Sequence, residues 1–231
     1  MNWSTLSLAL LASSALAAPL PAVAAGKPPV VVVELFTSQG CSSCPPANAN
    51  LIELSKRADV LPLSFAVTYW DYLGWKDSFD APEYTDRQVA YEKPLGQQGP
   101  YTPQMVINGV STVVGNNLDE VNRAVAAARP LAGAEVTLAG GKVSIGAATA
   151  PGDADVWLVR YDPNLVEVPV ARGENTGRTL PHTHVVHSLT RLGSWSGAAA
   201  AYDLPAADTG LKTAVLVQAA NGGSILGAAT D

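Results

Sequence analysis

Through about residue 130, the chain alternates apolar runs of strand length with segments of helical periodicity. Residues 29–36 form a β-branched run, residues 47–57 have helical periodicity, and residues 61–70 alternate apolar with smaller or polar side chains. A strand, a helix and a strand in this order join parallel neighbours through a right-handed crossover. The pattern therefore predicts a parallel pair of strands with a helix packed against it.

The alternation continues as far as Pro130, which ends the last predicted helix. An Asn108-Gly109 pair lies between two short apolar runs, and this dipeptide is typical of a two-residue turn in an antiparallel hairpin. The predicted elements are a helix over residues 81–91, strands over residues 105–107 and 110–114, and a helix over residues 118–128.

Beyond residue 130 the pattern changes to short strands separated by turn residues, without a convincing helix. Strand patterns at this spacing favour a small β-sandwich. The predicted strands cover residues 134–138, 142–145, 154–161, 166–171, 182–192, 213–218 and 224–229. We therefore expect two domains, over residues 27–130 and 131–231.

The first 25 residues contain no charged side chain and include an apolar stretch followed by small residues. This is the pattern of a secretory signal peptide with cleavage after Ala17, Ala24 or Ala25. A membrane anchor is the alternative, but Pro19 and Pro21 interrupt the run well short of about 20 apolar residues. We expect a periplasmic or secreted protein with no stable membrane span after signal removal, in a compartment where disulfides persist.

Composition and charge argue against one class of partner, nucleic acid, and indicate no other. The 231 residues are 48% apolar, which is enough for a sizeable core. The formal net charge is -6 and no basic run is present, so nucleic acid is not expected as a partner. The sequence does not indicate an oligomeric state.

The only two cysteines, Cys41 and Cys44, lie between the first predicted strand and the first predicted helix. A thiolate at a helix N-terminus is stabilised by unpaired N–H groups and by the helix dipole, which lower its pKa. The spacing lets Cys44 resolve a mixed disulfide that Cys41 forms. Pro45 and Pro46 suit the first helical turn, where a missing N–H costs little.

Two other interpretations of the cysteine pair stay open. A structural disulfide is possible, although a loop this short removes little chain entropy. A metal site would need further ligands; of the three histidines, His182 or His184 is the candidate, while His187 would point the other way on a strand. On a strand His182 and His184 would share one face, and a polar strand edge is the alternative for them.

The order of elements, with Thr102-Pro103 directly before the hairpin, resembles the thioredoxin fold over residues 28–130. This resemblance implies an α/β fold in which Pro103 is cis and faces the cysteine pair. It also implies that Thr102 offers backbone hydrogen bonds to a bound peptide and that Cys41 is an exposed nucleophile. The expected fold class is thus α/β, with a thioredoxin-like N-terminal domain and an all-β, sandwich-like C-terminal domain.

More narrowly, residues 34–47, 69–71, 101–104 and 172–180 are similar to a family of secreted bacterial proteins of unassigned function. That family has a thioredoxin-like N-terminal domain and a C-terminal β domain. The chain departs from well-studied thioredoxins because no tryptophan precedes Cys41 and the intervening pair is Ser42-Ser43. The direction of electron flow is therefore not transferable.

These features predict an exported thiol–disulfide oxidoreductase that acts on protein thiols or disulfides without a cofactor. The candidate catalytic residues are Cys41 and Cys44, and the candidate substrate-binding residues are Trp70, Tyr101, Thr102 and Pro103. The glycine-bracketed loop over residues 173–178 is either a long hairpin connection or a wall of the site. The alternatives are a binding module with a structural disulfide and a metal-handling envelope protein.

Overall fold

The computed structural model describes residue 1, residues 30–131 and residues 133–231. Residues 2–25, which carry most of the predicted signal peptide, lie outside the described residues. The described helices are α1 (Pro45–Leu54), the short 3₁₀ turn η1 (Asp71–Leu73), α2 (Pro82–Ala90) and α3 (Leu118–Ala127). The strands are β1 (Val31–Thr37), β2 (Val60–Ala66), β3 (Gln104–Ile107), β4 (Ser111–Val113), β5 (Val136–Ala139), β6 (Lys142–Ile145), β7 (Ala154–Asp162), β8 (Val166–Pro169), β9 (Thr179–His182), β10 (Val185–Trp195), β11 (Ala200–Asp203), β12 (Lys212–Ala219) and β13 (Ile225–Thr230).

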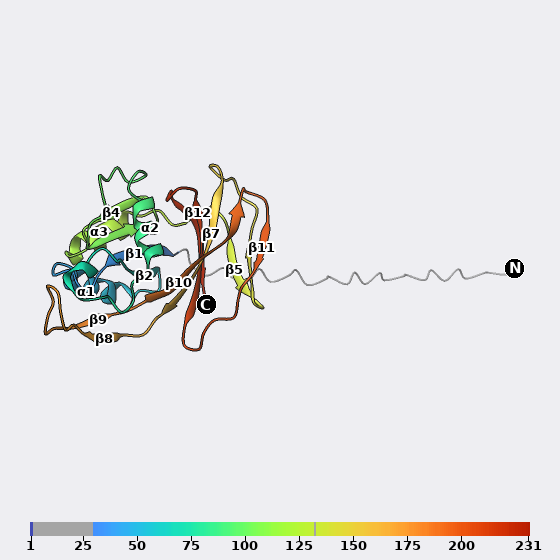
Figure 1. Ribbon diagram of the computed structural model, residues 1–231. Coiled ribbons are helices and arrows are strands. Elements are labelled where there is room, and N and C mark those ends of the chain that lie inside the picture. The colour runs from blue at the N-terminus through green and yellow to red at the C-terminus, as the bar shows by residue number, and fades with distance from the viewer. Residues whose placement is uncertain (2–29, 132) are drawn as a thin grey trace.

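Eight strands form one mixed sheet in the order β13-β12-β7-β10-β2-β1-β3-β4 (Figure 1). The pair β1 and β2 is parallel, and β3 and β4 form an antiparallel hairpin around Asn108-Gly109. Both pairings confirm predictions from the sequence. The halves of the sheet meet where β10 runs parallel to β2, with Val185 opposite Ser64 and a 2.8 Å hydrogen bond from the Ser64 N–H to the His184 carbonyl.

The expected fold class is wrong. The structure is mostly β, with 16% helix and 37% strand, and it is not clearly an α/β thioredoxin-like fold. Instead of a separate all-β sandwich, strands β7, β10, β12 and β13 extend the sheet that β1–β4 begin. The apolar pattern located these strands, but it carries no signal for the β10–β2 pairing that merges them. The proposed domain boundary at residue 130 stays a prediction.

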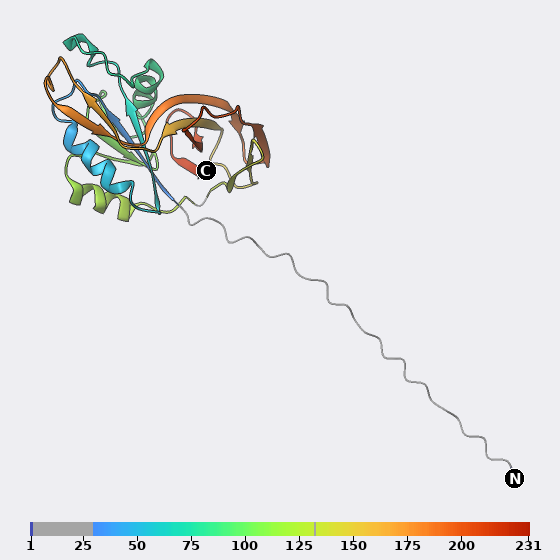
Figure 2. The same cartoon turned by 90° about the horizontal axis from the view of Figure 1, so that it is seen from below.

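The two faces of β1 belong to two different cores because successive side chains point to opposite sides of a sheet. Val31, Val33 and Leu35 pack against α1 and α3, whereas Val32 and Phe36 pack against α2 and strands of the C-terminal half. Figure 2 shows α1 and α3 next to each other on one face of these strands. Burial on both faces explains why β1 reads as a continuous apolar run.

A second, three-stranded sheet in the order β11-β6-β5 covers the far part of the large sheet (Figure 1). The core between these sheets includes Val143 and Ile145 of β6, Val156 of β7, Trp195 of β10 and Val217 of β12. A two-stranded arm, β8 and β9, extends from the large sheet toward α1. This arm brings the C-terminal half to the cysteines.

The predicted strand over residues 182–192 is divided in the structure. His182 ends β9, and β10 begins only at Val185. Between them His184 has φ +50, which is left-handed backbone that no strand continues. The turn at His184 separates two histidines that the strand prediction placed on one face.

Candidate disulfide site

Cys41 and Cys44 form a disulfide at the start of α1, with their Cα atoms 5.5 Å apart. Cys44 is the N-cap residue, and its carbonyl accepts the N–H of Ala47 at 2.9 Å. Pro45 and Pro46 occupy the first helical positions, as expected from the sequence. The pair thus lies at the positive end of the helix dipole, which favours negative charge, although the two prolines carry no N–H and the Ala47 N–H is already bonded.

Both cysteine residues are 0% exposed. The exposed Cys41 that the resemblance implied is therefore a wrong expectation. Ser42 and Ser43 between them are exposed, so the surface of the loop is formed by the two serines while both cysteines are buried. Any thiol partner must approach past this loop and the segments packed on it.

The Thr102–Pro103 peptide is cis and lies next to the cysteine loop. The Ser43 hydroxyl donates to the Thr102 carbonyl at 3.4 Å, and Ser43 Oγ is also 3.3 Å from Cys41 Sγ. Trp70 Nε1 donates to Thr102 Oγ1 at 2.8 Å. The structure therefore brings together Cys41, Trp70 and Thr102, which the sequence selected.

Tyr101 makes hydrogen bonds to the hairpin and to α2. Its hydroxyl lies 3.1 Å from Thr112 Oγ1, and its carbonyl accepts the Gln88 side-chain amide at 2.7 Å. Pro103 is buried.

Residues 173–178, which connect β8 to β9, close over the cysteine loop from the C-terminal half. The Asn175 side chain is 0% exposed and donates to the carbonyls of Gln39 and Cys41, both at 2.9 Å. The Glu174 carboxylate accepts the Ser42 N–H at 2.9 Å. Arg178 fixes Asn175 by donating to its Oδ1 at 2.7 Å. The glycine-bracketed pattern predicts either a hairpin connection or a wall of the site here, and it carries no signal for the roles of these side chains.

A buried carboxylate lies behind the same loop. Asp77 Oδ2 accepts the Gln39 N–H at 2.6 Å, and Asp77 Oδ1 accepts the Phe79 N–H at 2.9 Å. Burial raises the pKa of Asp77 to about 6, against the lowering effect of these two bonds. Asp77 belongs to residues 71–79, which have no periodic pattern that would mark it as a site residue.

The histidines do not converge on the cysteines as a ligand set. His182 is buried beside α1, with Nδ1 3.4 Å from Asn48 Nδ2, and burial lowers its pKa to about 4. His184 stacks on Tyr161 with ring centroids 5.4 Å apart. Within the described ranges, no three His, Cys, Asp or Glu side chains are grouped to hold a metal ion.

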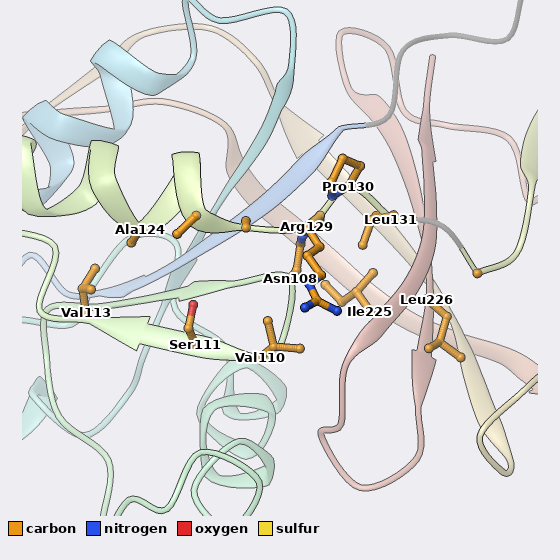
Figure 3. Close-up of a pocket in the computed structure, with 13 residues that line it drawn as sticks. Asn108, Val110, Ser111, Val113, Ala124, Arg129, Pro130, Leu131, Ile225 and Leu226 are labelled. Carbon is orange, nitrogen blue, oxygen red and sulfur yellow. Dashed lines mark hydrogen bonds between the residues drawn. The ribbon is translucent and has the colours of Figure 1, made fainter.

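An apolar pocket of about 660 Å³ lies at the opposite end of β1, remote from the disulfide. Figure 3 shows Val110 and Ser111 of the hairpin, Ala124 of α3, and Ile225 and Leu226 of β13 around it. Asn108 organises this end, because it accepts the Val32 N–H at 2.8 Å and donates to the Arg129 carbonyl at 3.0 Å. The pocket does not contribute to the cysteine site.

The fold and site define a mostly β protein with a covered disulfide at a helix N-terminus. The chain belongs to the family described as "Protein of unknown function (DUF1223)", which it matches over residues 32–218. Among solved structures it is similar to protein AGR_C_4864 from Agrobacterium tumefaciens, with 36% identity and a TM-score of 0.74. That alignment covers 89% of this chain and 95% of the other.

A second solved structure shares the fold alone. HBP35 of Porphyromonas gingivalis is 16% identical, with a TM-score of 0.56 over 88% of this chain and 74% of that chain. A comparison with curated proteins finds no match. In the part of the chain that the structure describes, no helix is both long and apolar enough to cross a membrane.

Proposed function

We propose that the protein is an exported thiol–disulfide oxidoreductase whose redox centre is the Cys41–Cys44 pair. The supporting observation is the position of the disulfide at the N-terminus of α1, with the Ser43 hydroxyl 3.3 Å from Cys41 Sγ. A thiolate on Cys41 would lie at the helix terminus and would accept the Ser43 hydroxyl hydrogen, which would then leave the Thr102 carbonyl. The carbonyl of Thr102 next to Ser43 offers an acceptor for an extended substrate chain.

The exchange requires no cofactor. A substrate thiolate attacks Cys41 Sγ, forms a mixed disulfide and displaces Cys44 as a thiolate. The second substrate thiol, once deprotonated, attacks the substrate sulfur of the mixed disulfide and displaces Cys41. Two electrons thus pass to the cysteine pair, one substrate disulfide forms, and the two substrate protons end on Cys41 and Cys44. The reverse sequence reduces a substrate disulfide.

A turnover assay tests this proposal. We expect the full chain to catalyse reduction of a reporter disulfide peptide by a dithiol, and Cys41→Ser to fall to the uncatalysed rate. Cys44→Ser keeps the attacking thiol but not the resolving thiol, so it should accumulate a covalent mixed disulfide with the peptide. Mass spectrometry detects this species. Equal rates for wild type and Cys41→Ser would refute catalysis.

A binding module with a structural disulfide is the second candidate, and the full burial of both cysteines favours it. The two functions differ in reduction potential, because structural disulfides have potentials below about -300 mV and redox centres are more easily reduced. Equilibration of the chain with glutathione or dithiothreitol buffers measures this potential. A pair that stays oxidised below about -300 mV would support the binding module.

A further inference from the structure

We infer that Glu174 is a positioning residue that sets the acidity of the Cys41 thiol, so that the C-terminal half tunes the redox centre. The inference rests on the proposed function and deepens it. It starts from one contact: Glu174 Oε2 accepts the N–H of Ser42, the residue directly after Cys41, at 2.9 Å. The two partners are 132 residues apart in the sequence.

This contact is held in place by the rest of the loop. The neighbouring Asn175 is 0% exposed and is bonded to the carbonyls of Gln39 and Cys41, so the backbone of residue 174 cannot drift from the cysteine loop. Gly173 has φ +78, and its position lies against Gly40 and Trp75. The carboxylate is thus positioned by buried contacts, although Glu174 itself is exposed.

The chemical consequence appears when the disulfide is reduced. A thiolate on Cys41 would draw on the N–H groups at this corner, and Glu174 already occupies one of them. A fixed negative charge beside a second anion also disfavours that anion. Glu174 therefore raises the pKa of the reduced Cys41 thiol and makes the protein a weaker oxidant than its helix terminus alone would make it.

Other charged groups face the same corner, and the test must separate them. Asp77 is bonded to the Gln39 N–H behind the loop, and Lys76 pairs with Asp80 at 3.2 Å on the same segment. Arg178 lies on the loop itself and is bonded to Asn175. Of these groups, Glu174 is the one bonded to a backbone N–H between the two cysteines.

The variant Glu174→Gln separates charge from structure, because glutamine keeps an oxygen that accepts the Ser42 N–H but carries no charge. The matched control is Glu167→Gln, since Glu167 is exposed and lies on β8 of the same arm. In a Cys44→Ser background only the Cys41 thiol remains, and the pH profile of its alkylation by iodoacetamide gives its pKa. We expect Glu174→Gln to lower this pKa by about 0.5–1 unit and Glu167→Gln to leave it unchanged.

The reduction potential provides the second measurement, on the chain with both cysteines. We expect Glu174→Gln to shift the glutathione equilibrium toward the reduced protein by about threefold to tenfold. An unchanged pKa in both Glu174→Gln and Glu174→Ala would overturn the inference. A shift in Glu174→Ala alone would retain it, because only the alanine variant releases the Ser42 N–H. Because neither measurement requires turnover, a chain that fails the reporter assay but shows these shifts would refute the proposed function and retain the inference.

Discussion

At the scale of single residues, the site depends on polar side chains buried around the disulfide. Asn48, one turn into α1, joins Thr37 at the end of β1 to His182 at the end of β9. His182 Nε2 has no hydrogen-bond partner within the described part of the chain. A buried imidazole in this state is neutral, because ionisation would leave an unpaired charge away from water.

His182 predicts a pH dependence of stability. Burial lowers its pKa to about 4 from an ordinary value near 6.5. Because the pKa of His182 is lower in the folded state, the unfolded state binds the proton more readily as pH falls from 6.5 toward 4. The free energy of unfolding therefore decreases over this range, by about 3 kcal/mol in total. We expect His182→Gln to reduce, without abolishing, the dependence of the unfolding free energy on pH between 6.5 and 4, measured by urea denaturation, because burial also lowers the pKa of His184 to about 4.

The matched control for this prediction is His187→Gln, since His187 is exposed on β10. It should reproduce the wild-type slope even if it changes absolute stability. The comparison uses slopes because glutamine also alters packing against Phe79, whose ring centroid lies 5.7 Å from that of His182. Equal slopes in His182→Gln and wild type would show that His182 does not titrate as its burial requires.

The candidate residues could be predicted from the sequence only where a local motif marks them. Cys41 and Cys44 have their spacing, and Thr102-Pro103 has its place before a hairpin. Glu174, Asn175 and His182 act on the cysteine loop from more than 130 residues away, or through a side chain on α1. A single polar residue in a loop or at a strand end has no periodic pattern, so its partner across the fold is not visible.

At the scale of elements, the hairpin turn at Asn108-Gly109 fixes the end of β1 opposite the disulfide. The Asn108 carbonyl accepts the Ile225 N–H of β13 at 2.9 Å, so the turn also anchors the C-terminal half. Gly109 lies close to residues 223–225, where β13 begins. A Cβ atom at Gly109 would lie 2.6 Å from the Gly223 carbonyl oxygen.

Gly109→Ala should therefore cost more than the conformational strain of its φ of +67. Gly140 provides the control, because its φ is +58 and nothing lies within 4 Å of its Cβ position. We expect Gly140→Ala to lose about 1 kcal/mol of unfolding free energy and Gly109→Ala about 1–3 kcal/mol more, from overpacking. Chemical denaturation of both variants measures the difference, and equal losses would contradict the close packing.

Most elements could be predicted from the apolar pattern, and their assembly could not. Helices α1, α2 and α3 follow the expected segments within a few residues, and Asn117 caps α3 by accepting the Glu120 N–H. Strand β11 was missed because it is short and half-exposed. The prediction of the fold class was wrong because it missed the β10–β2 pairing, which joins two strands more than 100 residues apart in the sequence.

At the scale of the whole molecule, a buried ionic network joins β1 and α2 of the N-terminal half to β12 of the C-terminal half. Glu34 of β1 is 0% exposed, and Arg87 of α2 donates to its Oε1 at 2.5 Å. Arg87 also bonds Gln218 of β12 at 3.1 Å and Tyr91 at 3.2 Å, and the Tyr91 hydroxyl donates to the second oxygen of Glu34. The Glu34 charge beside it raises the pKa of Arg87, although burial alone acts in the opposite direction.

This network accounts for Glu34, the one charged residue in β1. Removal of one partner leaves the other charge buried and unpaired, which typically costs about 3–5 kcal/mol. We therefore expect Arg87→Met to lose about this much unfolding free energy, whereas Lys56→Met, which breaks the exposed pair with Glu53, should cost less than about 1 kcal/mol. Urea denaturation measures both losses.

The double variant distinguishes a buried charge from lost packing. If Glu34 is the penalised group in Arg87→Met, the further change Glu34→Gln removes its charge and should restore part of the loss. Losses that simply add would mean that Arg87 acts through its packing on Phe65, Tyr91 and Trp157. Partial restoration would show that the charge pair couples α2 to β1, the strand that leads to Cys41.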